Sequence, residues 1–110
     1  MRINTLDWDP QAALMARAKQ RWDALVANDL KTAYSFMSPG TRQIVSYEGY
    51  ITSIRPGFWK AAQVKRAECS EATVCEMVIE IQYDYRGMRV TTPLRESWAQ
   101  TDGEWWYVPK

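Results

Sequence analysis

The chain has 110 residues, enough for one domain over residues 1–110 and too few for a second. Hydrophobic residues make up 46% and charged residues 25%, as in a folded globular protein. The formal net charge of +1 argues against nucleic acid as a partner, and the absence of histidine excludes every mechanism that needs a histidine base or metal ligand in this chain.

The first segment has the spacing of a helix. Asp9 is the expected N-cap, and Pro10 suits the first helical position. Apolar residues then recur at steps of four, four and three residues, which places them on one helical face: Leu14, Ala18, Trp22 and Leu25.

A second, shorter helix follows a break. Asn28 is the expected break and N-cap, and Ser38-Pro39-Gly40 is the expected end. The residues that share its apolar face are Leu30, Ala33, Tyr34 and Met37. Residues 41–54 suggest one or two further helical turns, and residues 55–57 (Arg-Pro-Gly) end the helical half.

The second half has the alternation of strands. Residues 58–68 form a first expected strand, and residues 73–85 alternate between apolar and polar positions. Arg86-Gly87 and Asp102-Gly103 are expected two-residue hairpin turns. These turns fix the register, with Tyr83 opposite Val90, Ile79 opposite Leu94, Cys75 opposite Trp98, Asp84 opposite Arg89, Trp98 opposite Tyr107 and Gln100 opposite Trp105.

This order of elements predicts an α+β fold, in which N-terminal helices pack on a bent antiparallel sheet of about four strands. The core shared by helices and sheet should contain residues from both layers: Trp22, Leu25, Ile79, Ile81, Leu94 and Trp98.

The pattern resembles the nuclear-transport-factor-2-like superfamily, a cystatin-like cone-shaped roll. The resemblance rests on the opening helix, on Asp29-Leu30-Lys31-Thr32-Ala33-Tyr34 with the residues that follow it (Phe36, Ser38-Pro39 and Arg42), and on the terminal strands from Trp98 to Trp105. It implies a cone-shaped cavity between helices and sheet. Small bacterial members are often exported or membrane-tethered domains, and other members are enzymes such as ketosteroid isomerase, so the fold implies no single chemistry.

Cys69 and Cys75 are the two cysteines, and they flank an expected turn. If that turn is centred on Ala72, they lie opposite each other and can form a disulfide, which would place the protein in an oxidising compartment. The alternative is a pair of buried thiols in the cytoplasm. A metal site is not expected from two thiols alone.

Glu96 is the candidate for acid–base chemistry, because the register places it among apolar groups opposite Met77. Tyr83 is the nearest hydrogen-bonding partner expected on that face. The structural alternative is an ion pair with Arg17 or Arg21 from the opening helix. A bulge at Pro93 would reverse the faces of this strand.

Aromatic side chains supply most of the expected ligand-binding residues. Tyr47, Tyr50, Phe58 and Trp59 cluster where the helices meet the sheet, where they either stack on a flat apolar ligand or close the cavity. The full set expected to bind a ligand is Trp22, Tyr47, Tyr50, Phe58, Met77, Tyr83, Glu96 and Trp98.

The opposite sheet face is polar, and Glu80 is expected to meet Arg95 diagonally across it. Trp106 and Val108 fall on this side too, so the face could support a homodimer or dock a protein partner. The simpler interpretation is a solvated face.

The leading functional hypothesis is a non-catalytic module without a cofactor that binds an apolar small molecule or a protein. The alternatives are a small isomerase- or cyclase-like enzyme using Glu96, and a structural domain of an envelope assembly. We expect a periplasmic or secreted location, or otherwise the cytoplasm. No stretch approaches the roughly 20 apolar residues of a membrane span, and residues 1–9 lack the features of a signal peptide.

Overall fold

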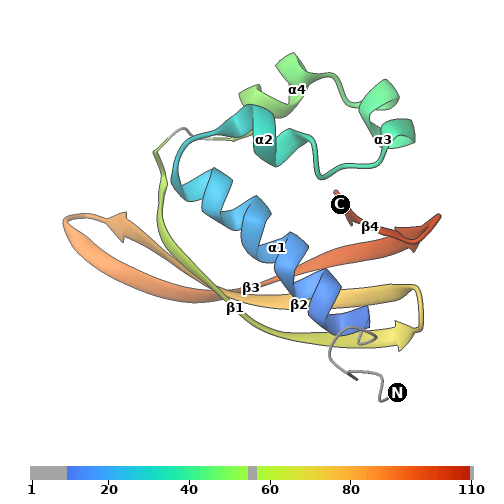
Figure 1. The fold of residues 1–110 in the computed structure, drawn as a ribbon. Helices are drawn as coiled ribbons and strands as arrows, with labels where there is room; N and C mark the ends of the chain where they lie inside the picture. Colours follow the sequence, from blue (N-terminus) through green and yellow to red (C-terminus); the bar gives the residue numbers. More distant parts are fainter. Residues whose placement is uncertain (1–9, 55–56, 110) are drawn as a thin grey trace.

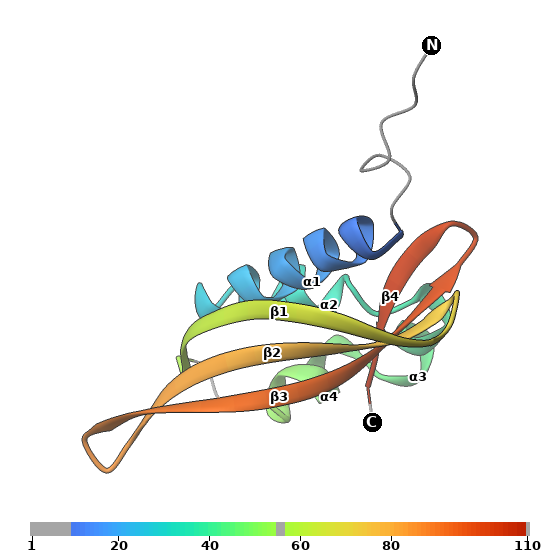
Figure 2. The same cartoon turned by 90° about the horizontal axis from the view of Figure 1, so that it is seen from below.

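The computed structural model describes residues 10–54 and 57–109. Helices cover one face of a single antiparallel sheet with the strand order β1-β2-β3-β4, which confirms the predicted α+β fold (Figure 1). The elements are α1 Pro10–Val26, α2 Leu30–Tyr34, α3 Pro39–Ile44, α4 Tyr47–Thr52, β1 Trp59–Glu71, β2 Val74–Tyr85, β3 Met88–Thr101 and β4 Glu104–Val108. The sheet is bent and does not close, and α1 lies along its covered face (Figure 2).

Helix α1 buries the predicted apolar stripe against the sheet. Leu14 and Ala18 are fully buried, and Trp22 and Leu25 nearly so. Arg21 lies on the same stripe, because it follows Ala18 by three residues and precedes Leu25 by four. The predicted N-cap, Asp9, lies outside the described residues.

The break after α1 lies at Asn28 as predicted, but the N-cap of the next helix differs from the prediction by one residue. Asn28 has a φ of 62°, a left-handed conformation that asparagine tolerates, and it ends α1. The N-cap of α2 is Asp29, whose side chain accepts a hydrogen bond from the Thr32 amide at 3.2 Å. The predicted helix end at Ser38-Pro39-Gly40 is wrong: α2 ends at Tyr34 with Ser35 as its C-cap. Ser38 instead caps α3, and Pro39 lies in the first turn of that helix.

The strand register agrees with the prediction at every pair that the two hairpin turns fixed. Pro93 pairs with Glu80 without a bulge, so Glu96 stays on the helix-covered face, opposite Met77. The first strand runs on to Glu71, beyond its predicted end, and carries three register shifts against β2. Beside the helices, the Tyr107 amide donates to the Phe36 carbonyl at 2.8 Å and so ties β4 to the segment that follows α2.

The core is the predicted one with one exception. Trp22, Leu25, Ile79, Ile81 and Trp98 are buried, but Leu94 is only half-buried. Leu94 is less buried because it borders a cavity between α4 and β3.

The outer face of the sheet carries a different ion-pair network from the predicted one. Arg95 does not pair with Glu80; its Nη1 lies 2.6 Å from Glu68 and 3.2 Å from Glu76. The reason is that β1 places Glu68 directly opposite Glu76, so that both carboxylates converge on one guanidinium. Trp106 is half-buried beneath Arg17, whose Cζ lies 5.1 Å from its ring centroid. The homodimer through this face stays a prediction.

Cys69 and Cys75 pair across β1 and β2 and form the predicted disulfide. Reducing it should lower the free energy of unfolding by about 2 kcal/mol, because a cross-link over so short a loop removes little entropy from the unfolded chain. Urea unfolding with and without a reductant measures the change. The double variant Cys69→Ser/Cys75→Ser is the control, since reductant should leave its midpoint unchanged. Equal midpoints for the oxidised and reduced wild type would contradict the prediction.

Candidate functional site

A cavity of about 560 Å³ lies between α4, the middle of β3 and the end of the chain. It occupies the space beyond the reach of β4, which pairs with β3 only from Ser97 to Thr101. Residues of α4 and of this part of β3 line the cavity together, and Figure 2 shows that β4 does not run along this part of β3. The apolar wall comes from Met37, Val45, Ile54 and Leu94, and the polar wall from Arg21, Tyr50, Glu96 and Tyr107.

A buried ion pair forms the polar end of this cavity. Arg21 Nη1 lies 2.7 Å from Glu96 Oε2, and the two residues are only 5% and 4% exposed. Of the two arginines that sequence analysis offered to Glu96, the structure selects Arg21. Arg17 instead donates to the Trp105 carbonyl from Nε and Nη2, at 3.0 and 2.8 Å.

Two indoles complete the surroundings of the Glu96 carboxylate. Oε1 accepts hydrogen bonds from Trp22 Nε1 at 3.0 Å and from Trp98 Nε1 at 3.1 Å. The positions of these residues in the sequence explain the arrangement. Trp22 follows Arg21 directly on α1, and Trp98 lies two residues from Glu96, so that both side chains are on the same face of β3. Three N–H donors therefore hold one carboxylate, which is the arrangement that a buried charge requires.

Arg21 also rests on an aromatic ring. Its Cζ lies 3.7 Å from the centroid of Tyr107, a cation–π contact that favours the charged guanidinium in a desolvated site. The guanidinium is thus fixed by Glu96 along its edge and by Tyr107 along its face.

Two buried donors beside the cavity lack a hydrogen-bond partner among the described residues. They are Arg21 Nε and the hydroxyl of Tyr50, whose residue is 6% exposed. Both atoms are themselves inaccessible to solvent, so neither is exposed to the cavity, although both residues line it. Trp105 Nε1 is also unpaired, but Trp105 does not line this cavity.

Burial raises the pKa of the Tyr50 hydroxyl above its ordinary value of 10.0, and the positive charge of Arg21 only partly opposes the rise. The pKa of Tyr107 is raised for the same reason. Both hydroxyls therefore stay protonated at neutral pH.

These raised pKa values predict a loss of stability in alkali. Above pH about 10 the unfolded chain loses tyrosine protons that the folded chain keeps, so the free energy of unfolding falls as pH rises. Urea unfolding at a series of alkaline pH values measures the slope, and Tyr50→Phe/Tyr107→Phe should make it shallower. An unchanged slope in that double variant would assign the effect to other groups.

The other predicted site residues lie away from this cavity. Tyr83 is not a partner of Glu96: it lies on β2 opposite Val90, and Val90 is six residues, or about 20 Å, from Glu96 along β3. Its ring stacks on Phe58 with centroids 5.0 Å apart, and Trp59 contacts both rings. Tyr47 packs on Tyr34, with centroids 5.5 Å apart, while Met77 is fully buried in the core.

Of the residues predicted to bind a ligand, the cavity brings together Tyr50 and Glu96. Sequence analysis named Arg21 only as a possible partner for Glu96 and did not place it in a ligand site. The signal was present, since a charged residue on the apolar stripe of α1 must find a partner inside the fold.

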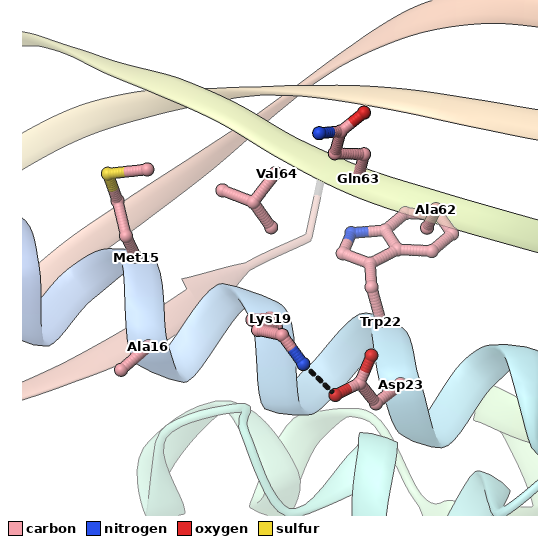
Figure 3. Close-up of a pocket in the computed structure, with 8 residues that line it drawn as sticks. All are labelled: Met15, Ala16, Lys19, Trp22, Asp23, Ala62, Gln63 and Val64. Carbon is pink, nitrogen blue, oxygen red and sulfur yellow. Dashed lines mark hydrogen bonds and ion pairs between the residues drawn. The ribbon is translucent and has the colours of Figure 1, made fainter.

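A second hollow of about 490 Å³ lies between α1 and β1 (Figure 3). Its floor is apolar, with Met15 and Val64 facing each other across the helix–strand junction. Its polar groups are already paired: Lys19 with Asp23 at 2.7 Å, and Gln63 with Lys65 at 3.3 Å. It therefore offers mainly apolar contact, whereas the cavity at Arg21 combines an apolar wall with a buried polar wall and is the stronger candidate site.

The described residues contain no group of three or more acidic or cysteine side chains placed to hold a metal ion. Within the same ranges, no helix is both long enough and apolar enough to span a bilayer.

No family model matches the sequence, and no curated protein matches it. Solved structures do resemble the fold. A SEC-C motif containing protein from Rhodopseudomonas palustris superposes with a TM-score of 0.64 at 11% identity, over 86% of this chain and 73% of that one. One from Psychrobacter arcticus superposes with a TM-score of 0.69 at 9% identity, over 88% of this chain and 60% of the other. At such low identities the likeness shows a shared fold alone.

Proposed function

We propose that the chain is a small-ligand-binding module and that its ligand occupies the cavity between α4 and β3. The observation that carries the proposal is the cavity of about 560 Å³ itself, which combines an aliphatic wall with the polar wall at Arg21, Tyr50 and Glu96. A ligand with an apolar body would gain affinity there by burying hydrocarbon surface against the aliphatic wall.

The surroundings of Glu96 favour binding over catalysis by that residue. Both lone pairs of Oε1 point to indole N–H groups, and Oε2 is held by Arg21. A general acid or base must reach the substrate proton, whereas this carboxylate is committed to three partners of its own chain. This supports a positioning role for Glu96 over the alternative of an isomerase- or cyclase-like enzyme that uses it as acid or base.

We also assign the fold to the nuclear-transport-factor-2-like superfamily as part of this proposal. Its support is the succession of helices before a bent antiparallel sheet, together with a cavity between the two layers. The disulfide between Cys69 and Cys75 supports function in an oxidising compartment such as the periplasm, since such bonds persist there.

The test is binding of Prodan, an uncharged naphthyl ketone whose emission shifts to the blue in apolar surroundings. We expect the wild-type protein to shift the emission, and Leu94→Trp to abolish the shift by filling the cavity. Val64→Trp is the matched control, because it fills the α1–β1 hollow instead. Loss of the shift in Val64→Trp with retention in Leu94→Trp would move the site to that hollow. No shift with the wild type would contradict the proposal.

A further inference from the structure

We infer that residues 38–53, the arm that carries α3 and α4, form a movable wall of the cavity, which Tyr34 latches to the rest of the protein and a bound ligand holds closed. The inference rests on the proposed function and adds a regulation of the same site. The latch sets how often the arm opens, and the ligand stabilises the closed arm.

Little buried surface anchors the arm. Helix α3 buries none of its residues, and α4 buries Tyr50 alone. The other apolar contacts of the arm with the core, from Val45 and Ile51, are only partly buried, and Ile44 is 86% exposed. A segment with so few buried contacts opens at a lower free energy than the whole fold. The arm can therefore leave the body of the protein while the sheet stays folded.

The arm begins next to a fixed point of the fold. Met37 is fully buried, and it forms a bridge to Tyr107 of β4. Arg42 Nε donates to the Met37 carbonyl at 2.9 Å, so the first helix of the arm is tied at its base. Movement of the arm therefore starts after Met37, at Ser38, and leaves β4 in place.

Tyr34, the last residue of α2, joins both helices of the arm to the rest of the protein. Its hydroxyl donates to the Val45 carbonyl at 2.6 Å, and the Arg42 carbonyl lies 3.1 Å away as a second acceptor. Its ring contacts Tyr47 and Tyr50, with centroid distances of 5.5 and 5.4 Å. One side chain outside the arm thus holds the end of α3 and two positions of α4, which is the geometry of a latch.

The cavity lies between the arm and the sheet. The arm contributes four residues to the cavity wall: Val45, Gly49, Tyr50 and Ser53. Strand β3 contributes Leu94 and Glu96, which do not move with the arm. A ligand in this space contacts the arm and the sheet together, so it binds the closed form more tightly than the open form and shifts the population toward the closed form.

Amide hydrogen exchange of the full chain, followed by NMR, tests whether the arm opens by itself. The amides of Val45 and Tyr50 donate to carbonyls within the arm, at 2.8 and 2.9 Å. Their protection should be lower than that of amides in the centre of β2 by about tenfold or more. Ile79→Ala destabilises the core and should lower protection in β2 without changing it in the arm. An arm that is protected as strongly as β2, and weakened with it by Ile79→Ala, would overturn the inference and leave the binding module in place.

Tyr34→Phe tests the latch, because it removes the hydrogen bond to Val45 and keeps the ring. Protection of the arm should fall about fivefold, and protection of β2 should stay unchanged. Tyr47→Phe is the matched control on the same ring pair, since it removes a hydroxyl that is not part of the latch. Equal effects of the two variants on the arm would contradict the role of Tyr34 and overturn the inference.

Prodan serves as the ligand probe. At about ten times its dissociation constant it should raise protection of the arm about tenfold, because the arm must release the probe before it opens. Amides beside the Arg86-Gly87 turn should not respond, since this turn does not line the cavity. Binding of Prodan without a change in the arm would overturn the movable wall alone. Failure of the wild type to bind Prodan would contradict the proposed function and the ligand-held closure with it, whatever the exchange of the free arm.

Discussion

Replacing Arg21 by methionine should lower the free energy of unfolding by about 3–5 kcal/mol. The substitution keeps the length and the apolar stem of the side chain but removes the charge that faces Glu96. It leaves a carboxylate that is 4% exposed with two indole donors and no counter-charge. Most of the loss is the cost of that uncompensated buried charge.

Urea unfolding followed by tryptophan fluorescence measures this loss, because Trp22 and Trp98 touch the altered site. Arg89→Met is the matched control: Arg89 pairs with Asp84 at 2.6 Å, but both side chains are about half exposed. An exposed pair of this kind contributes about 1 kcal/mol or less. Equal losses for the two variants would show that burial of the Arg21–Glu96 pair has no special weight.

The double variant Arg21→Met/Glu96→Gln separates the charge from the contacts. Glutamine keeps an oxygen that the two indoles can donate to, while both charges are gone. It should be more stable than Arg21→Met alone by on the order of 2 kcal/mol, because no unpaired charge stays buried. A double variant that is no better than the single one would instead point to lost packing against Tyr107.

The sheet could be predicted from the sequence because its turns are local. Arg86-Gly87 and Asp102-Gly103 each place a non-glycine residue and a glycine at positive φ, with values of 52°, 79°, 54° and 78° in chain order. A two-residue turn fixes the pair that closes it, and strict alternation carries that register along the strand. The pairing of Glu96 with Met77 and of Cys75 with Trp98 follows from this arithmetic alone.

The site could be predicted only in part. Its residues come from α1, α4, β3 and β4, and no local pattern in the sequence shows how these elements pack against one another. Register placed Glu96 on the covered face, yet it could not choose between Arg17 and Arg21, since the choice depends on how α1 lies across β3. Tyr83 and Glu96 share a face, but sharing a face says nothing about separation along the strand. Leu94 belongs to the same alternation as Ile79, and only the end of β4 at Val108 explains why it borders a cavity.

Truncating Ile79 to alanine should lower the free energy of unfolding by about 2–5 kcal/mol. The variant loses the hydrophobic stabilisation of the buried methyl and methylene groups that are removed, and it leaves a cavity in the core. Ile79 is fully buried at the centre of β2, between Val64 of β1 and Leu94 of β3. Ile44→Ala is the matched control, since the Ile44 side chain on α3 is 86% exposed and the same truncation there should change stability by about 0.5 kcal/mol or less. Chemical denaturation of both variants and the wild type gives the comparison. A loss below about 0.5 kcal/mol at Ile79 would contradict its place in the core.

Such a result would also contradict the position of Glu96. The hairpin turn between β2 and β3 places Ile79 opposite Leu94. The same register and the same alternation of faces place Glu96 under α1, where it pairs with Arg21.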